Sequence, residues 1–262
     1  MTDIEIEQKQ TSSVVVSSVV VKKTRTKKQQ ECLQSCFVEN TKTLEIGIDE
    51  AGRGPMLGRV YTAAAILPKD NTFDHSLMKD SKRFHSDKKI KEAAEYIKKN
   101  AIIWSVQYAE RDEIDTLNIR NATHVAMHKC VLDIIQRLNC ISNNTTAVAS
   151  EYHLLVDGND FKPFVMMNHE EGFLQVQHTC IEGGDNKYSA IAAGSILAKV
   201  ARDQYIDDLC NEHPELDERY GLRSNKGYGT KIHMDGIKKY GISPYHRTSF
   251  GICKLSQKSC IE

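Results

Sequence analysis

The sequence predicts an α/β fold with a helical addition at its C-terminal end. Two observations predict it: apolar runs of strand length alternate with longer segments of helical periodicity, and the tail of the chain contains a capped helix. The chain has 262 residues, of which 40% are hydrophobic and 27% charged. It can therefore bury a full core without disulfide or metal staples.

The first half of the predicted fold contains three strands and two helices. Residues 44–48 alternate in polarity and are rich in β-branched side chains, and residues 60–67 resume this pattern after a glycine-rich turn. We expect these two segments to be neighbouring strands. Residues 86–99 predict a helix and 102–108 a third strand. Residues 118–138 predict a longer helix, with an apolar stripe of Ala122, Val125, Ala126, Leu132, Ile135 and Leu138.

The second half continues the alternation. Residues 152–156 form an apolar run of strand length, and 174–180 predict a further strand. A third helix is expected over 189–209, opened by a Gly-Gly-Asp-Asn turn. The last helix is predicted to begin after Thr230 as N-cap and to stop at Gly241.

The chain divides into three parts by composition: an arm at 1–42, an α/β domain at 43–215 and a helical extension at 216–262. Within the arm, residues 11–21 are a run of Ser, Thr and Val, and 22–28 carry five Lys or Arg. Two interpretations stay open: a disordered leader, or a basic arm that binds nucleic acid or directs nuclear import.

Charge and targeting signals exclude several classes. Lys and Arg number 35, as do Asp and Glu, so a polyanion partner must be held by a local patch. No run reaches the roughly 18 to 20 apolar residues of a membrane span, and no signal peptide opens the chain. We expect a cytoplasmic protein with no membrane partner. Its eight scattered cysteines are expected to be reduced, mostly packing residues.

Four carboxylates at the ends of predicted elements carry the candidate chemistry. Asp49 and Glu50 follow an apolar strand, where unpaired charges are costly, so a cation is expected there. Both can reach one cation only if the strand ends and turns there. Asp157 and Asp185 occupy comparable places. Hard oxygen ligands favour Mg²⁺ or Mn²⁺, and two such ions can hydrolyse a phosphodiester. The alternatives are an Asp-Gly turn at Asp157 and a helix N-cap at Asp185.

Other motifs are weaker. Gly52-Arg-Gly54 is not a dinucleotide-binding loop, because a strand rather than a helix follows it. His124 and His128 lie four residues apart, but Val125 replaces the Glu of H-E-x-x-H, so we expect two partly exposed histidines. The sequence has no G-x-S-x-G motif, which would carry the nucleophilic serine of an acyl-transfer enzyme.

The extension is basic. Residues 219–258 contain nine Lys or Arg against one acid, interleaved with Tyr220, Tyr228, Tyr240 and Tyr245. This pattern favours nucleic-acid binding, with positive charge on phosphates and exposed rings on bases or sugars. A solvated basic face with buried tyrosines is the alternative.

Several ordered motifs together resemble type 2 ribonuclease H, the ribonuclease HII family. They are Asp49-Glu-Ala-Gly-Arg-Gly-Pro55, Asp80-Ser-Lys82, Leu155-Val-Asp-Gly158, Gly184-Asp185 with residues 191–203, and Lys226-Gly-Tyr-Gly-Thr with His246-Arg-x-Ser-Phe250. The match runs from about 44 to 251. It implies a ribonuclease H-like fold, with a mixed sheet flanked by helices and a C-terminal helical extension that binds substrate.

The resemblance also implies an activity and its residues. Substrates would be RNA/DNA hybrids and duplex DNA with embedded ribonucleotides, cut to 5′-phosphate and 3′-hydroxyl ends. The ligands of Mg²⁺ or Mn²⁺ would be Asp49, Glu50, Asp157 and Asp185. The 2′-hydroxyl would be read by Gly52, Arg53 and Gly54, mainly through backbone groups; Tyr228 would stack on a sugar and Lys82 contact a phosphate.

The Gly-Tyr-Gly-Thr motif resembles single-chain bacterial members, so we expect a monomer. Two other functions compete with the ribonuclease. A junction or transposition nuclease would use clustered acids without discriminating a 2′-hydroxyl. A non-catalytic hybrid-binding module would leave its nucleic acid intact.

Overall fold

The computed structural model describes residues 32–39, 42–142, 151–168 and 172–256. Its central sheet has the strand order β3-β2-β1-β4-β7. The strands are β1 (Leu44–Ala51), β2 (Val60–Ile66), β3 (Ile103–Ala109), β4 (Tyr152–Asp157) and β7 (Gln177–Ile181). Strands β1, β2 and β3 are antiparallel neighbours, whereas β4 runs parallel to β1 and to β7. The mixed sheet and the pairing of the first two strands are thus as predicted.

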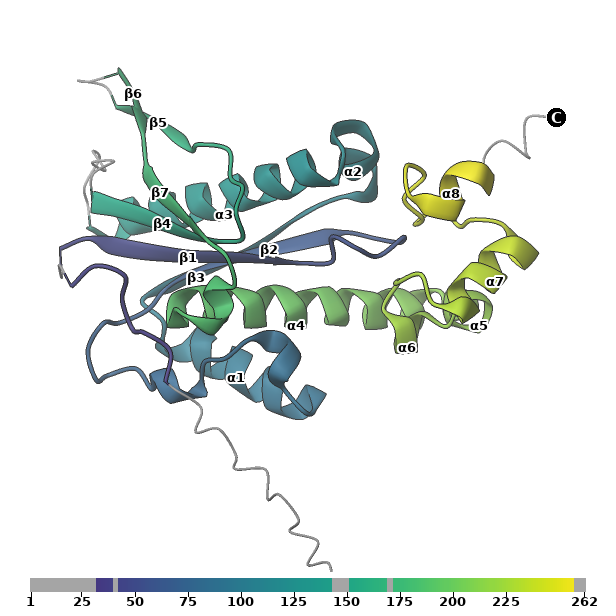
Figure 1. Cartoon of the computed structure of the whole chain (residues 1–262), viewed down its shortest axis with the longest axis horizontal. Helices are drawn as coiled ribbons and strands as arrows, with labels where there is room; N and C mark the ends of the chain where they lie inside the picture. The colour runs from purple at the N-terminus through teal and green to yellow at the C-terminus, as the bar shows by residue number, and fades with distance from the viewer. Residues whose placement is uncertain (1–31, 40–41, 143–150, 169–171, 257–262) are drawn as a thin grey trace, which may run out of the picture. The chain divides into compact units, whose positions relative to one another are not determined.

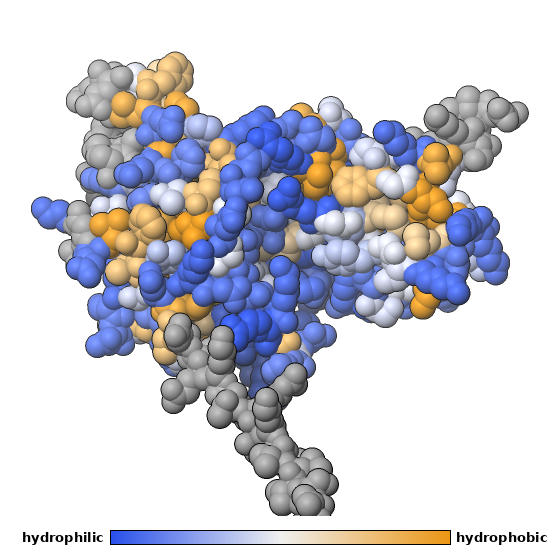
Figure 2. Space-filling view, in the orientation of Figure 1, coloured by the Kyte–Doolittle hydropathy of each residue, from blue (hydrophilic) through white to orange (hydrophobic). Residues whose placement is uncertain are grey.

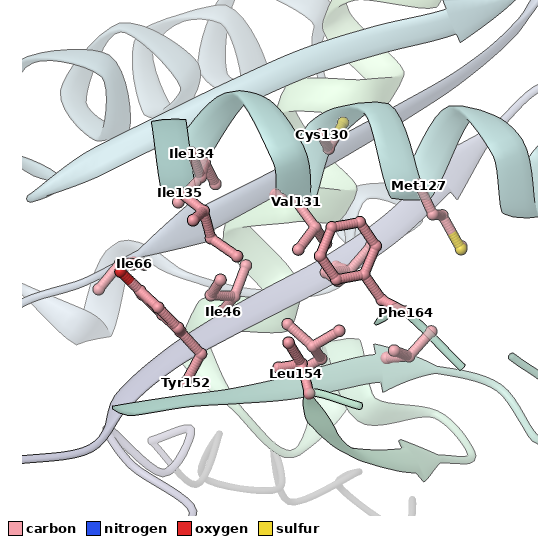
Figure 3. Packing of buried hydrophobic residues seen from close by; sticks show 14 of the residues in the cluster. Ile46, Ile66, Met127, Cys130, Val131, Ile134, Ile135, Tyr152, Leu154 and Phe164 are labelled. Atoms are coloured by element: carbon pink, nitrogen blue, oxygen red, sulfur yellow. The ribbon is translucent and has the colours of Figure 1, made fainter. Parts of the chain in front are cut away.

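Helices cover both faces of this sheet (Figure 1). Helix α3 (Ile119–Ser142) lies on one face, and α1 (Asp87–Asn100) and α4 (Ser189–Glu212) lie on the other. Figure 3 shows the core under α3, where Met127, Val131 and Ile135 meet the sheet residues Ile46 and Leu154. Burial of these apolar side chains supplies the main stabilisation of the fold.

Helix α4 lies unusually close to β1. A Cβ atom on Gly47 would lie 2.1 Å from the carbonyl carbon of Ala190, and one on Gly194 would lie 3.1 Å from the backbone nitrogen of Asp49. A side chain on Gly47 would overlap the backbone of α4, and one on Gly194 would be in tight contact with the backbone of the sheet. The first half of α4 is therefore buried against the strand that carries Asp49 and Glu50.

The predicted strand at 174–180 is in fact two strands. Val176 is buried and donates its N–H to the carbonyl of Phe164, which separates β6 (Gly172–Gln175) from β7. Strand β6 pairs with β5 (Val165–Asn168) in a separate antiparallel hairpin, which was not predicted because each strand has only four residues. Figure 2 shows hydrophobic residues gathered on this hairpin, where Met167 and Phe173 are 70% and 79% exposed.

The predicted stripe of the long helix is wrong at two positions. Val125 and Leu132 are 36% and 46% exposed. Hydrophobic residues occur on more than one side of α3, so three-and-four spacing alone does not identify the face that meets the sheet. The buried face also includes Met127, Cys130, Val131 and Ile134, which the stripe omitted.

The C-terminal part continues from the end of α4 as a set of short helices. These are α5 (Pro214–Tyr220), α6 (Leu222–Asn225), α7 (Lys231–Tyr240) and α8 (Gly251–Ser256). Thr230 caps α7 as predicted, its side chain accepting the N–H of His233. Residues of these helices share a core cluster with Met56, Leu57 and the end of α4.

The remaining elements are short. They are α2 (Arg111–Leu117) and the 3₁₀ turns η1 (His75–Leu77), η2 (Ser81–Arg83) and η4 (Gly184–Asn186). Helix α2 was not predicted, since it buries only Ile114. No helix in the described part of the chain is long and apolar enough to cross a membrane. Residues 1–31 and 40–41 lie outside the described residues, so the expectations for the basic arm stay predictions.

Candidate active site

A cleft of about 460 Å³ opens where β1 and β4 end. Eight of the nine residues predicted for the site line it: Asp49, Glu50, Gly52, Arg53, Gly54, Lys82, Asp157 and Tyr228. They come from β1 and the loop after it, η2, β4 and the segment between α6 and α7. Asp185 does not line the cleft, but the charge of Asp157 contributes to raising its pKa. The sheet thus gathers residues that are distant in sequence.

Asp49 is the most buried carboxylate of the cleft, with 5% of its surface exposed. Its Oδ1 accepts the backbone N–H of Glu50 at 2.7 Å, and the Ser195 side chain also hydrogen-bonds to it. Burial raises the pKa of Asp49 well above its usual range, and the charges of Glu50 and Asp157 raise it further. Asp49 is a buried acid with acidic neighbours.

Strand β1 does not end at Glu50 as expected but continues to Ala51. Asp49 and Glu50 nevertheless line one cleft. Burial raises the pKa of Glu50, while Arg53 opposes this, its Nη1 lying 3.3 Å from the Glu50 Oε1. On β4, Asp157 is more than the acid of an Asp-Gly turn, because its Oδ1 accepts the N–H of Gly184 at 2.7 Å.

Asp185 lies in η4 and is not a helix N-cap, since Tyr188 occupies that position of α4. Its Oδ1 accepts a hydrogen bond from the Asn186 side chain at 3.0 Å. Burial, with the charges of Asp80 and Asp157, raises the pKa of Asp185 to about 6. The N-cap alternative is therefore wrong, and Asp185 belongs to the same group of mutually repelling acids.

This donor set fits a hard divalent cation by its chemistry. The ligands would all be carboxylate oxygens, and a cation would relieve the repulsion that raises the pKa values of Asp49 and Asp185. Among the described residues, however, no three His, Cys, Asp or Glu side chains are arranged to hold one ion.

The glycine loop, Gly52 to Gly54, lines the cleft together with Tyr228. Gly52 has φ +93°, and a Cβ there would lie 2.8 Å from Nε of Arg202. A Cβ on Gly54 would lie 3.2 Å from Cε1 of Tyr228. The Tyr228 ring, which is 49% exposed, therefore lies beside Gly54 and leaves little room for a side chain there. Backbone groups and an aromatic face are both available to a sugar here.

Several charged residues of the cleft belong to the motifs named above but were given no role at the site from the sequence. Lys199, Arg202 and Asp203 line it from α4, and Lys226 lines it from the end of α6. The three α4 residues lie at positions i, i+3 and i+4, so their shared helical face could have revealed them. Arg202 is 2% exposed, and its Nη2 donates to the carbonyls of Leu57 and Lys226 at 2.9 and 3.3 Å.

The histidine pair of α3 is not a zinc site. His124 Nε2 lies 3.5 Å from the Asp160 carboxylate, and His128 Nε2 lies 2.8 Å from the carbonyl oxygen of Lys162. The expectation of partial exposure is wrong for His124, which is 5% exposed. Packing against Phe161 removes it from solvent.

The tyrosines of the basic extension divide between surface and core. Tyr228 and Tyr240 are 49% and 46% exposed, whereas Tyr220 is 1% exposed and donates its hydroxyl to the Gly241 carbonyl. Tyr245 is partly buried, so Tyr228 and Tyr240 are the most exposed of the four. Three of the seven described cysteines, Cys130, Cys210 and Cys253, are buried.

Known proteins resemble this chain in both sequence and fold. The family model for ribonuclease HII matches residues 46–253. A protein named ribonuclease HII from Bacteroides fragilis is 40% identical over 213 residues, which is 81% of this chain and 92% of the relative. The family model begins within β1 and ends within α8, so it excludes the basic arm.

Two solved structures share the fold. Ribonuclease H2 from Pyrococcus horikoshii OT3 superposes with a TM-score of 0.56 at 21% identity, covering 83% of this chain and 99% of that one. Bst-RNase HIII in complex with Mn²⁺ superposes with a TM-score of 0.55 at 16% identity, covering 83% and 70%. The family model matches most of the chain, and a relative of the same family is 40% identical over 81% of it, so the chain belongs to the ribonuclease HII family, whose members are ribonuclease H enzymes.

Proposed function

We propose that this enzyme hydrolyses the RNA strand of RNA/DNA hybrids and also incises duplex DNA at single embedded ribonucleotides. The observation that carries the proposal is the shared cleft of Asp49, Glu50 and Asp157 with the glycine loop and Tyr228. Acids suited to a phosphodiester reaction line the same cleft as backbone groups suited to a 2′-hydroxyl, the one group that distinguishes a ribonucleotide from its neighbours.

Asp49, Glu50, Asp157 and Asp185 would hold Mg²⁺ or Mn²⁺. When bound, such ions activate a water and stabilise the leaving 3′-oxygen. The remaining residues bind and orient. Backbone groups of Gly52, Arg53 and Gly54 would contact the 2′-hydroxyl, and the Tyr228 ring would stack on the next sugar.

Lys82 would contact a phosphate at the edge of the cleft. It is exposed and lines the cleft, and its charge opposes the rise that burial causes in the pKa values of Glu50 and Asp185. A cation beside the acids can steer a phosphate toward them. Monomeric action and a cytoplasmic location also stay predictions.

One assay tests the proposal. An end-labelled DNA duplex carrying one ribonucleotide is incubated with the enzyme in Mg²⁺ or Mn²⁺, beside an all-DNA duplex and a long RNA/DNA hybrid. We expect cleavage of the first and third, none of the second, and none after chelation of the metal. Cleavage of the all-DNA duplex would indicate a junction or transposition nuclease. Binding without cleavage of any duplex would indicate a hybrid-binding module.

A further inference from the structure

Arg247 lies in the segment between α7 and α8 and is fully buried. It forms no ion pair with any described residue. Its guanidinium instead donates all five N–H bonds to backbone carbonyls of one loop, residues 52–59. Nε donates to Gly58 at 2.7 Å; Nη1 donates to Arg53 and Pro55 at 3.0 and 2.7 Å; Nη2 donates to Gly52 and Arg59 at 2.7 and 3.0 Å.

The backbone around Arg247 holds the same loop. The N–H of Arg247 donates to the Met56 carbonyl at 2.8 Å, and the N–H of Gly58 donates to the Tyr245 carbonyl at 2.9 Å. Leu57 and His246 form an isolated β-bridge. The loop has no helix or strand of its own between β1 and β2. Its conformation therefore depends on the C-terminal part of the chain.

This dependence joins the extension to the candidate site. Gly52, Arg53 and Gly54 belong to the loop that Arg247 holds, and two of their three carbonyls are its acceptors. Those carbonyls point to the guanidinium. In a trans peptide plane the N–H points opposite to the C=O, so the N–H groups of the same two planes point away from Arg247. A lysine could not replace this arrangement, because its three donors radiate from one atom whereas the guanidinium fork is planar and wide.

We propose that Arg247 is a positioning residue that fixes the backbone of residues 52–59 and so sets the recognition of the 2′-hydroxyl by Gly52, Arg53 and Gly54. The inference rests on the proposed function. It assigns to the C-terminal extension a part in selecting the substrate, in addition to any part in binding it.

The test compares Arg247→Lys with Leu216→Ala. Leu216 is 3% exposed in α5 and packs in the core of the extension, so its truncation destabilises the same region without removing a bond to the loop. Both are assayed on the single-ribonucleotide duplex well below their melting temperatures. We expect kcat of Arg247→Lys to fall at least tenfold with KM changed less than threefold. Leu216→Ala should stay within twofold of the wild type.

Amide hydrogen exchange supplies a readout independent of activity. We expect Arg247→Lys to speed exchange at Met56 and Gly58 relative to β1, and Leu216→Ala to leave it unchanged. If Arg247→Lys does not fold, amide exchange of the wild type is measured instead. Exchange of the Met56 and Gly58 amides as fast as in an open loop would overturn the inference. Protection of these amides equal to that of β1 would support it.

The outcomes separate the two proposals. If the wild type does not incise the ribonucleotide duplex, the inference falls together with the proposed function. If it does incise, and both variants lose equal activity and exchange equally, only the inference falls.

Discussion

At the position of Asp49, a neutral side chain would make the folded protein more stable than a carboxylate does. It is 5% exposed, and its neighbours Glu50 and Asp157 share its sign of charge. Because its pKa is raised, the folded protein holds a proton that the unfolded chain has released once the pH exceeds the usual aspartate value. The carboxylate therefore destabilises the metal-free fold progressively as the pH rises.

We predict that Asp49→Asn abolishes cleavage and increases the free energy of unfolding by about 1 kcal/mol at pH 8. The amide oxygen can still accept the Glu50 N–H. The gain in the free energy of unfolding should shrink as the pH falls toward 4, where the wild-type carboxyl is protonated. Urea unfolding of the wild type and the variant at pH 8 and pH 4, without metal, measures this gain. A variant less stable than the wild type at pH 8 would show that Asp49 has a structural role.

Tyr228 offers a second residue-scale test. Its ring contacts the glycine loop at Gly54 and is half exposed. Stacking of a ring on a nucleotide contributes about 1–3 kcal/mol. We predict that Tyr228→Ala lowers kcat/KM on a single-ribonucleotide duplex by about tenfold or more and on a long hybrid by less. Tyr228→Phe, which keeps the ring, should retain activity. Equal losses on both substrates would remove the proposed role.

At the scale of elements, residues 32–38 form a segment that packs against the domain ahead of β1. The N–H of Gln34 donates to the Lys187 carbonyl at 2.8 Å, and its carbonyl accepts the Ser189 N–H at 2.9 Å. The Phe37 ring packs edge-on against Tyr188. These contacts hold the junction of η4 and α4, directly after Asp185.

The same segment satisfies a buried acid. Glu45 is 4% exposed, and its carboxylate accepts the N–H groups of Phe37 and Val38, each at 2.8 Å. Lys69 is a further donor to this carboxylate, its Nζ lying 2.8 Å from Oε1 of Glu45. Removing the segment would leave a buried carboxylate with fewer donors.

We therefore predict that a chain beginning at Thr43 is less stable than one beginning at Cys32, by about 2 kcal/mol for the lost backbone and carboxylate hydrogen bonds. Thermal unfolding of the two chains measures this. Glu45→Gln in the longer chain is the matched control for the carboxylate alone and should account for part of the loss. Equal melting temperatures of the two truncations would show that the segment does not stabilise the domain.

At the scale of the whole molecule, a buried histidine pair inside the extension joins Tyr228 to α7 and to the segment that follows α7. His233 Nδ1 lies 3.0 Å from the Tyr228 carbonyl, its Nε2 lies 3.0 Å from Nε2 of His246, and the N–H of Ser243 donates to Nδ1 of His246. All three bonds form with both rings neutral if His233 is protonated at Nδ1 and His246 at Nε2. Protonating His246 at Nδ1 would break the chain of bonds.

This pair predicts how stability depends on pH. Burial and the neighbouring His233 lower the pKa of His246 to about 3. Between pH 6.5 and 3 the unfolded chain binds a proton that the folded protein does not, so stability is lost as the pH falls, by about 1.4 kcal/mol per unit. Urea unfolding of the wild type and His246→Gln between pH 7.5 and 4.5 measures it. Parallel pH profiles of the two proteins would contradict the prediction.

Local sequence was sufficient for the elements with a strong pattern. The alternation of 44–48 and 60–67, the Thr230 cap and the acids at strand ends all depend on neighbours within a few residues. The short hairpin β5–β6 and helix α2 have too few buried residues for a periodic pattern, so sequence analysis missed them.

The sequence by itself determined the α/β fold, the family and eight of the residues that line the cleft. Only the tertiary structure decided how these residues are held. In the sequence Arg247 is one more cation of a basic tail, yet in the fold it is buried and donates to five carbonyls of a loop about 190 residues earlier in the chain. Charge and spacing are local properties of a chain, whereas burial and hydrogen-bond partners arise only when distant segments pack together.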